Sequence, residues 1–257
     1  MIRIVFLLRR KPDLTLDEFQ KYWREEHGPL VASHARHIDA LRYVQVHRVE
    51  QPSAEPMAAA RGGMEPPYDG VAELWWESEA ALAATFENDR GREAGAALLE
   101  DEQRFIDLPN SPLWFAHEYP QVNPTPENIV ARERSSIVKL YYPLRSRAEL
   151  GDAAAQRYWH TMHGPLIRSA ASASGILRYQ QVHRFDSPVE QQLRAARGTV
   201  VPSYMGHAEL WFDRSVQRGG SEVAAAGARA TEDESKFIDF KRSCMWFGKE
   251  HVFIDRM

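Results

Sequence analysis

The chain has 257 residues, of which 44% are hydrophobic and 26% charged, and its formal net charge is −4 at pH 7. This balance is typical of a globular protein with a buried core, and the absence of a Lys/Arg block argues against a nucleic-acid surface. The single cysteine, Cys244, excludes an intrachain disulfide and fits a reducing compartment. We therefore expect a cytoplasmic protein whose partners are neither nucleic acids nor membranes.

An apolar run between basic residues opens the chain. It is too short for a signal peptide or a membrane span, so we expect a buried strand over residues 2–9. Thr15 followed by Glu18 has the spacing of a capping box, which predicts a helix from there to His27. The Gly-Pro pair after His27 is expected to break this helix, and its proline can begin a second, short one.

Strands are predicted next over residues 41–49 and 71–76, separated by a long loop over residues 51–70. A helical stretch of some 25 residues, rich in Ala, Leu and Glu, leads to a last strand over residues 113–118. The order β-α-β-β-α-β is that of a ferredoxin-like unit.

The second half of the chain repeats the first. YWREEHGPLV, which begins at Tyr22, returns as YWHTMHGPLI from Tyr158, and LRYVQVHR at Leu41 returns as LRYQQVHR at Leu177. The separation is the same for both pairs and for the motif AELW, and we call it the repeat interval. Such self-similarity predicts two copies of one structural unit.

Insertions and deletions separate the copies elsewhere. The Phe-Ile-Asp block at 105–107 returns at 237–239, short of the repeat interval, so the second copy has lost four residues after its third strand. A shared Ile-Val pair at 4–5 and 137–138 aligns the first strands. On this alignment, copy two has about three extra residues and carries Tyr142 and Pro143 where copy one has Arg9 and its neighbour.

The predicted organisation is repeat 1 over residues 1–119, a linker over residues 120–134 and repeat 2 over residues 135–257. Three prolines in PQVNPTPEN favour an extended linker. Each sheet has one face covered by its own helices, so the bare faces can pack together. The predicted fold is therefore α+β, with two ferredoxin-like β-α-β-β-α-β repeats packed sheet to sheet around a barrel-like interior.

Several motifs resemble the EthD family. They are FQKYWREEHGPLV, LRYVQVHR, RGGMEPPYDGVAELWW and the final FID…WF block, and the likeness extends over nearly the whole chain in two copies. The EthD family belongs to the dimeric α+β barrel superfamily. The resemblance implies that this chain forms, within one molecule, the barrel that single-copy relatives form by dimerising. Fused chains could pair further into a homodimer.

Strand alternation suggests which side chains face the interior. The apolar centres of strands 41–49 and 71–76 suit packing under helices, which leaves the polar faces for the interior. Carboxylates, imidazoles and aromatic walls suit a mostly apolar, partly oxygenated ligand. The alternative is a water-bridged polar interface that only joins the sheets. The predicted substrate-binding residues are Tyr43, Gln45, His47, Glu73 and Trp75 in copy one and Tyr179, Gln181, His183, Glu209 and Trp211 in copy two.

His27 and His163 are the candidate catalytic residues. An imidazole titrates near neutrality, and a helix C-terminus favours its protonated form, so each can act as a general acid or base. The alternative is that each histidine only caps the last carbonyls of its helix. The resemblance adds that the HGPL histidine is a common candidate for the active residue. Four aromatic neighbours are predicted at the pocket mouth: Tyr22, Trp23, Tyr158 and Trp159.

The two copies differ at other histidines, which predicts one competent site or two unequal ones. His34 and His37 align with Ala170 and Ala173. Copy one is more like the family, so His27 is favoured as the main catalytic residue, with Arg9 as a partner for an anion or carbonyl.

Neither metal nor cofactor is expected. His34 and His37 have a spacing that could seat a metal, but no third ligand accompanies them, so a solvated helix face is favoured. Some barrels of the superfamily bind haem through a histidine, but this sequence carries no haem signature.

The function predicted from these features is a cofactor-independent enzyme. Histidine acid/base chemistry would act on a hydrophobic, oxygenated small molecule, such as an aromatic, polyketide-like or carbonyl-bearing ring, in a lyase, dehydratase, cyclase or isomerase reaction. Tyr43, Gln45 or Arg9 would stabilise the oxyanion. One alternative, which the resemblance allows, is a cofactor-free oxidoreductase or monooxygenase. The other is a non-catalytic accessory protein that binds a small molecule.

Overall fold

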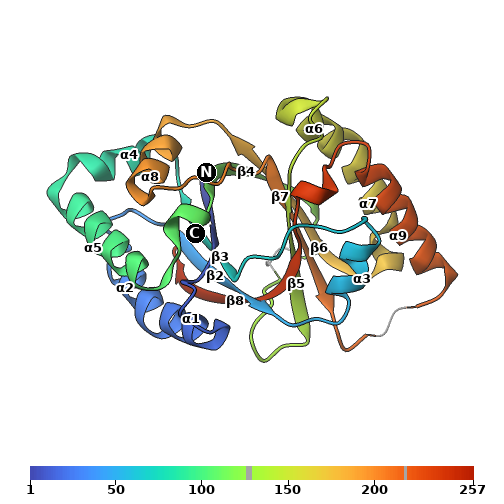
Figure 1. Ribbon diagram of the computed structural model, residues 1–257, viewed down its shortest axis with the longest axis horizontal. Coiled ribbons are helices and arrows are strands. Elements are labelled where there is room, and N and C mark those ends of the chain that lie inside the picture. Colours follow the sequence, from blue (N-terminus) through green and yellow to red (C-terminus); the bar gives the residue numbers. More distant parts are fainter. Residues whose placement is uncertain (126–128, 217–218) are drawn as a thin grey trace.

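A computed structural model describes residues 1–125, 129–216 and 219–257 (Figure 1). Their strands form one closed antiparallel barrel in the order β1-β3-β2-β8-β5-β7-β6-β4, and the helices cover it on two opposite sides. The strands are β1 (Ile2–Leu8), β2 (Arg42–Val49), β3 (Gly70–Trp76), β4 (Leu113–Val122), β5 (Ile137–Leu144), β6 (Ile176–Phe185), β7 (Gly206–Asp213) and β8 (Trp246–Asp255). The helices are α1 (Leu16–Tyr22), α2 (Gly28–Ser33), α3 (Ala54–Ala59), α4 (Glu79–Glu87), α5 (Asp89–Phe105), α6 (Gly151–Tyr158), α7 (Gly164–Ser174), α8 (Pro188–Arg197) and α9 (Ser221–Glu234).

The α+β class, the tandem repeats and the barrel are confirmed. The two repeats are joined more intimately than two stacked sheets, because their strands hydrogen-bond at both seams. β2 of repeat 1 pairs with β8 of repeat 2, and β4 of repeat 1 pairs with β6 of repeat 2. The outcome is a sheet without free edges, the arrangement that removes the tendency of edge strands to aggregate.

Two helices cross from one repeat to the other. The segment 51–70 was expected to be a loop, but it contains α3, whose Ala54 and Met57 pack against the hydrophobic core of repeat 2. In the same way, Val189 and Leu193 of α8 pack against the core of repeat 1. Figure 1 shows α3 beside α7 and α9, and α8 beside α4. Each repeat is therefore completed by a helix of the other.

The helix after β1 begins as predicted but does not break at Gly28. The capping box of Thr15 and Glu18 is present. A π-helical turn over Trp23–His27 then leads directly into α2, and Gly28 keeps helical angles (φ −58°, ψ −50°). Its amide donates to the Trp23 carbonyl, five residues back, so the chain stays helical where Pro29 lacks a donor. His27 therefore lies inside a continuous helical segment, and the predicted helix end, with its capping role and dipole effect, is wrong.

Strand register also corrects the alignment of the first strands. Arg3 of β1 lies opposite Trp75, and Lys139 of β5 lies opposite Trp211. The repeat interval thus applies from the first strand onward, and the alignment through Ile-Val was wrong. The counterpart of Arg9 is Arg145, because a shared dipeptide is a weaker constraint than the pairing of a whole strand.

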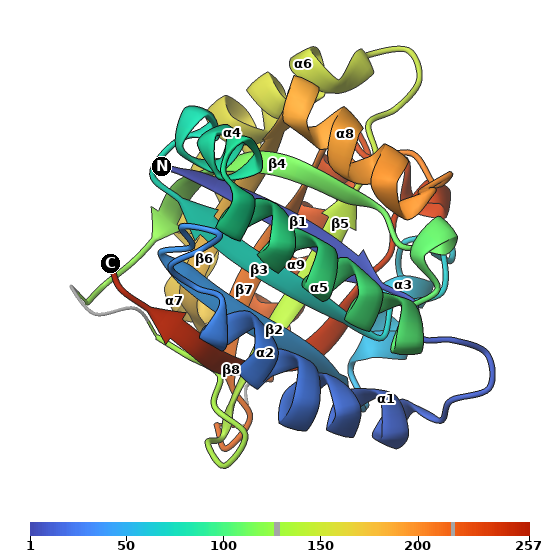
Figure 2. The ribbon, with the colours of Figure 1, turned by 90° about the vertical axis from the view of Figure 1, so that its left-hand side faces the viewer.

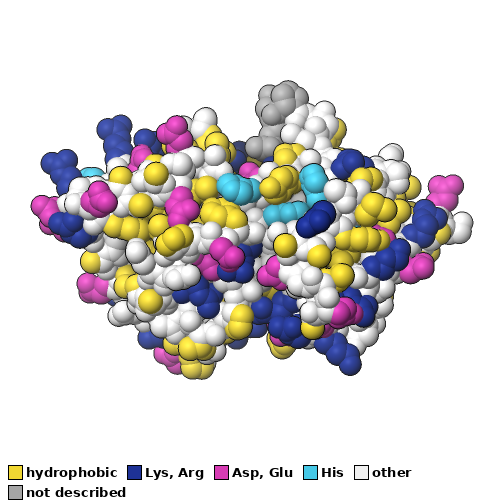
Figure 3. Space-filling model, turned by 90° about the horizontal axis from the view of Figure 1, so that it is seen from above, with side chains coloured by type: hydrophobic (Ala, Val, Ile, Leu, Met, Phe, Trp, Pro, Cys, Tyr) yellow, Lys and Arg dark blue, Asp and Glu magenta, His cyan; other side chains and the backbone are white. Residues whose placement is uncertain are grey.

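Smaller differences occur further along the chain. The long helix expected after β3 is divided at Asn88, whose side chain caps α5. β4 runs to Val122, into the segment expected as linker, of which residues 126–128 lie outside the described residues. No helix among the described residues is long and apolar enough to cross a membrane. On the face shown in Figure 3, acidic and basic side chains are interspersed.

Figure 2 shows α1, α2 and α5 lying over one face of the strands of repeat 1. Side chains therefore occupy two kinds of region, the barrel interior that the two repeats share and the layer between the sheet and the helices of each repeat. The predicted site residues are divided between them.

Candidate functional site

The barrel interior holds only part of the predicted site. Glu73 and Trp75 face it, together with their counterparts Glu209 and Trp211. Val44, which was expected to pack under helices, lies opposite Glu73 and faces the interior as well. The alternation of β2 was therefore assigned to the wrong faces, because a closed barrel can bury charged side chains on a face that also carries valines.

Tyr43, Gln45 and His47 lie on the opposite face, under the helices, and their predicted position in the interior is wrong. His47 stacks on Trp23 with ring centroids 4.5 Å apart. Gln45 donates through Nε2 to the Trp23 carbonyl at 2.7 Å. The Trp23 carbonyl thus accepts two hydrogen bonds, one from the Gly28 amide within the helical segment and one from Gln45 of the sheet. Repeat 2 has the same arrangement with Tyr179, Gln181, His183 and Trp159.

The two candidate histidines lie at the ends of the π-helical turns, and both are buried. His163 Nδ1 is 2.9 Å from Asp233 Oδ2, and the Tyr158 hydroxyl donates to the other oxygen of that carboxylate at 2.7 Å. In repeat 1, His27 Nδ1 is 2.7 Å from Asp101 Oδ2. The Tyr22 hydroxyl completes the same arrangement at 2.6 Å. Tyr22 and Tyr158 thus support the carboxylates.

The carboxylate at each histidine is held in its ionised form. For Asp233, burial alone would raise the pKa, but hydrogen bonds from Tyr158, Lys236 and His163 bring it below its usual value. An ionised Asp233 accepts the Nδ1 proton, which leaves Nε2 of His163 as the basic nitrogen. The contact with Asp233 is made through Nδ1, so Nε2 is the ring nitrogen of His163 that this pairing leaves over. This is the geometry of an oriented general base.

A cavity of about 1270 Å³ borders His163, and most of its lining residues belong to repeat 2. It lies between the sheet of β5, β7 and β6 and the helices α7 and α9, and α3 of repeat 1 lines one side. Most of its wall is aliphatic or aromatic, as in pockets for hydrophobic small molecules. Trp159 and Tyr179 are the other predicted residues that line it.

Repeat 1 carries larger side chains where repeat 2 has its cavity. Leu98 of α5 corresponds to Ala230 of α9, because Asp101 and Asp233 hold the equivalent histidines. The difference is repeated at neighbouring positions, and the larger side chains belong to one packed core cluster. The pairs, with repeat 1 first, are Ile38 and Ser174, Trp76 and Phe212, Leu98 and Ala230, and Leu99 and Thr231. The preference for His27 over His163 is therefore not supported by the packing.

The polar end of the cavity is formed across the repeats. Arg61, just after α3, donates through Nε to Glu234 Oε2 at 2.7 Å. The Tyr142 hydroxyl is 3.4 Å from the same oxygen, and its pKa is raised, first by burial and then by Glu234. Two adjacent residues thus have different partners. Asp233 contacts His163, and Glu234 forms the ion pair with Arg61 of the other repeat.

Arg9 is not brought to either histidine. Its guanidinium donates to the carbonyls of Pro66 and Pro67 and lies over the Tyr68 ring at 4.0 Å. Arg145 has the same role in repeat 2, over Tyr204 at 4.0 Å. The arginine is thus held at the turn before β3, and its predicted role as a partner for an anion or carbonyl stays a prediction.

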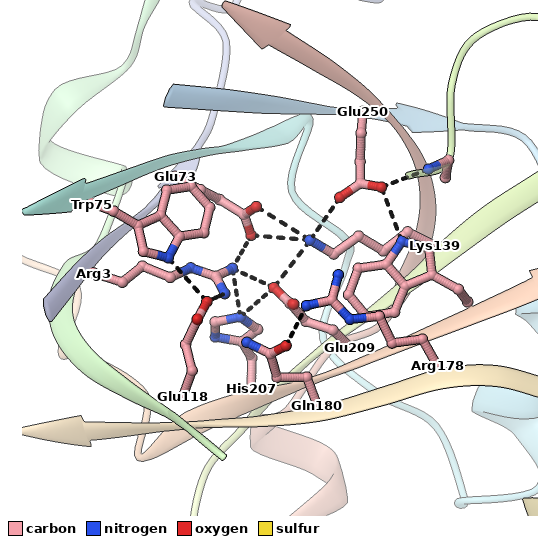
Figure 4. Close-up of polar contacts among 12 residues, drawn as sticks. Arg3, Glu73, Trp75, Glu118, Lys139, Arg178, Gln180, His207, Glu209 and Glu250 are labelled. Carbon is pink, nitrogen blue, oxygen red and sulfur yellow. Dashed lines mark hydrogen bonds and ion pairs between the residues drawn. The ribbon is translucent and has the colours of Figure 1, made fainter. Parts of the chain in front are cut away.

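A buried charge network occupies the barrel interior (Figure 4). Arg3 contacts Glu73 and Glu209, and Lys139 lies 3.2 Å and 3.0 Å from the same two carboxylates. Arg3 also bonds Glu118 at 2.8 Å, and Lys139 lies 3.3 Å from Glu250. Trp75 and Trp211 donate to the two outer carboxylates. The network is thus nearly symmetric between the repeats.

One carboxyl of the network titrates near neutrality. Burial raises the pKa of Glu73 to about 7, against the lowering effect of Arg3 and Lys139 and with a further rise from Glu209. Burial opposes ionisation of Glu209 too, but Arg3 and Lys139 hold its pKa well below the usual value. A proton on Glu73 balances the cluster, because three cations (Arg3, Lys139 and Arg178) face four carboxyl groups.

Glu73, His207 and Glu209 lie close enough together to suggest a metal site. Two cations already contact the carboxylates, since Arg3 and Lys139 both reach Glu73 and Glu209. The cluster is therefore an internally neutralised core, and it carries no metal assignment. His34 and His37 are 3.5 Å apart through their Nδ1 atoms on an exposed segment.

His207 is expected to make the fold sensitive to acid. Burial lowers its pKa to about 3 from 6.5, against a raising effect of Glu209. Between these two values the unfolded chain binds a proton that the folded chain excludes, so stability falls as the pH drops from about 6.5 toward about 3. His207→Val, which installs the residue of repeat 1 (Val71), should flatten this decline in urea unfolding series from pH 7 to pH 4. Identical slopes for wild type and variant would contradict the assignment.

Sequence reasoning missed the aspartates, but a signal existed. Asp101 and Asp233 stand in the repeated block EDE-x-x-FID at residues 100–107 and 232–239. Both copies keep an acid one turn before the Phe of FID, which places it on the helix face toward the sheet. Arg61 could have been found in the repeated AARG, whereas the cavity itself follows from alanines that any buried helix could carry.

Comparison with known proteins places this arrangement in a family. The EthD domain profile matches residues 11–109 and 147–241, so the chain belongs to the EthD domain family and contains two copies of the domain. No curated protein matches the sequence.

Among solved structures, the chain is similar to a "putative monooxygenase" from Lactobacillus acidophilus NCFM. The two are 9% identical with a TM-score of 0.48, over 99% of this chain and 96% of the other. A "Putative monooxygenase (FN1347)" from Fusobacterium nucleatum is 7% identical with a TM-score of 0.49, over 98% and 93% of the chains. "Putative Chlorite dismutase TA0507" is 12% identical with a TM-score of 0.44, over 97% and 94%.

Proposed function

We propose that this EthD protein is a cofactor-independent enzyme that uses His163 as a general base on a hydrophobic, oxygen-bearing small molecule. One observation carries the proposal: the oriented His163–Asp233–Tyr158 arrangement borders a large, mostly apolar cavity. A buried histidine whose Nδ1 is fixed by a carboxylate is suited to removing a proton from a bound substrate through Nε2.

The substrate would lie between the sheet and the helices of repeat 2. Its apolar body would contact the aliphatic and aromatic wall, and Nε2 of His163 would remove a proton next to a carbonyl. Arg61 and Tyr142 line the same cavity and could donate to the oxygen on which charge develops. Isomerisation, dehydration or cyclisation of a carbonyl-bearing ring follows from such an enolate-like intermediate.

The cavity gives a direct test of where the substrate binds. Ala230→Leu, which installs the Leu98 side chain of repeat 1, should remove most binding and turnover because it fills the space beside α9. The matched variant Leu98→Ala should lower the free energy of unfolding by about 0.5–3 kcal/mol, since Leu98 is only partly buried, and leave turnover unchanged. Turnover by a panel of aromatic and polyketide-like ketones and lactones, with thermal unfolding, checks both.

Other outcomes of this screen separate the alternatives. Unchanged turnover in Ala230→Leu would contradict the proposed binding site. Turnover that consumes oxygen would identify a cofactor-free monooxygenase using the same base, and tight binding without turnover would identify a carrier. A Soret band in the purified protein would show bound haem, and its loss in His163→Ala would assign the haem to this cavity.

A further inference from the structure

A second pocket, distinct from the His163 cavity, lies where β5 and β6 end and α8 begins. Its volume is about 450 Å³, and none of its lining residues borders the larger cavity. Four arginines line it, with only two carboxylates, Asp152 and Glu190, among the other lining residues. The arginines are Arg145, Arg184, Arg194 and Arg242.

Two of these arginines have no carboxylate within ion-pair distance among the described residues. Arg145 donates to the carbonyls of Pro202 and Ser203 at 3.0–3.1 Å. Arg194 donates to the Val201 carbonyl and the Ser203 hydroxyl, both at 2.8 Å. Carbonyl dipoles hold a guanidinium in place without cancelling its charge. The pKa of Arg194 is accordingly lowered, first by burial, with Arg184 adding to the effect against Glu190.

The other two arginines differ in how far carboxylates compensate them. Arg184 is 2.6 Å from the exposed Asp186, 3.5 Å from the buried Glu190 and 3.8 Å from Asp152, so three carboxylates share its charge. Arg242 reaches Asp239 only at 3.8 Å, on the surface. Exposed pairs of this kind are weak and leave an arginine free to contact an incoming anion.

Repeat 1 shows how the corresponding place is neutralised within the chain. There the buried carboxylate of Asp69 contacts Arg10 and lies 3.2 Å from Arg48. The repeat interval pairs Asp69 with Met205, which lines the pocket of repeat 2 and cannot accept these bonds.

Repeat 2 has also gained cations at this place. Arg194 occupies the position that Ala58 has in repeat 1. Arg242 occupies that of Asn110, once the four-residue deletion after the third strand is taken into account. Repeat 2 also carries Asp152 and Glu190 where repeat 1 has Leu16 and Ala54, and Ser146 where repeat 1 has Arg10. The pocket of repeat 2 therefore differs in the arrangement of its charges, because Arg145 and Arg194 have no ion-pair partner among the described residues.

We propose that this pocket binds a small molecule through a compact oxyanion, a phosphate or carboxylate group, between Arg145, Arg194 and Arg242. Planar guanidinium groups match such oxygens in geometry as well as in charge. The pocket is large enough for an organic anion that carries the group. Its separation from His163 makes it a site additional to the proposed catalytic cavity.

Isothermal titration of the full chain with inorganic phosphate, and separately with acetate, tests the proposal at ionic strength held constant with chloride. We expect saturable binding of one ion per chain, and the tighter of the two ions identifies the class of the natural ligand. Arg242→Glu, at an exposed position, should weaken binding by tenfold or more, a change of about 1.4 kcal/mol or above.

Two further variants complete the design. Met205→Asp installs the internal carboxylate of repeat 1 and should abolish binding. Arg92→Glu makes the same charge change on the distant helix α5 and should leave binding unchanged. If Met205→Asp does not fold, the change in anion affinity of Arg242→Glu still tests the proposal. Absence of saturable heat from both ions, or equal losses in Arg242→Glu and Arg92→Glu, would overturn the proposal.

Discussion

His163→Ala is expected to reduce kcat/KM by about 10²–10⁴-fold, whereas His27→Ala should leave it within about twofold of wild type. The two histidines have the same helical position and the same aspartate contact, but only His163 borders the cavity. His27 packs against Phe105 in the core of repeat 1, so its loss should lower the melting temperature instead. The measurement is steady-state turnover of any substrate found in the screen, with thermal unfolding of both variants.

Asp233→Asn separates a catalytic role of the aspartate from a structural one, because the two roles predict different changes in kcat and KM. An amide cannot fix the Nδ1 proton as a carboxylate does, so kcat should fall while KM stays near its wild-type value. Asp101→Asn is the matched control in repeat 1. Equal loss of turnover in the two repeats, or none in either, would show that the acid/base assignment to His163 is mistaken.

Glu209→Gln is expected to lower the free energy of unfolding by about 3–5 kcal/mol at pH 6, because it leaves Arg3 and Lys139 with too little buried negative charge. The equivalent change in repeat 1, Glu73→Gln, should cost no more than about 1 kcal/mol at the same pH, since an amide resembles a protonated carboxyl in size and hydrogen bonding. Burial raises the pKa of Glu73 to about 7, so this carboxyl is already mostly protonated at pH 6. Urea unfolding of both variants at pH 6 makes the comparison.

The pH dependence supplies the control for this pair. The pKa of Glu73 in the fold lies above its unfolded value of about 4.5. Its stabilising contribution is therefore complete below pH 4.5 and is lost as the pH rises through 7. Glu73→Gln lacks this loss and should gain stability relative to wild type between pH 6 and pH 8. Equal penalties for both variants at pH 6 would mean that both carboxyls are ionised.

Much of the architecture could be read from the sequence because repetition and local chemistry are written in it. The repeat interval, the Thr15–Glu18 capping box and the strands at 41–49 and 71–76 all depend on neighbouring residues. What alternation cannot decide is which face of a strand turns inward. In β2 the decision depends on Trp23 and on β8 of the other repeat, which no local pattern contains.

The site was predictable in kind rather than in place. Repetition identified both histidines, but the choice between them depends on whether α5 or α9 carries leucine or alanine. Both leucine and alanine fit a buried helix face, so the hydrophobic pattern of the sequence does not predict whether a cavity remains beneath the helix. The same holds for Arg9, whose partners are backbone carbonyls that no side-chain pattern indicates.

The strand pairs β2–β8 and β4–β6 have a consequence for folding. A single EthD copy of this chain would expose two hydrogen-bonding edges and would lack the helix that covers its flank. Neither half can therefore bury its surface until the other has formed, and the most distant contacts must be made before the barrel gains its stability. The two repeats are separate in sequence, but we expect them to unfold together in one cooperative transition. A substitution that unfolds the packed core of repeat 1 should therefore also unfold the repeat that carries the cavity.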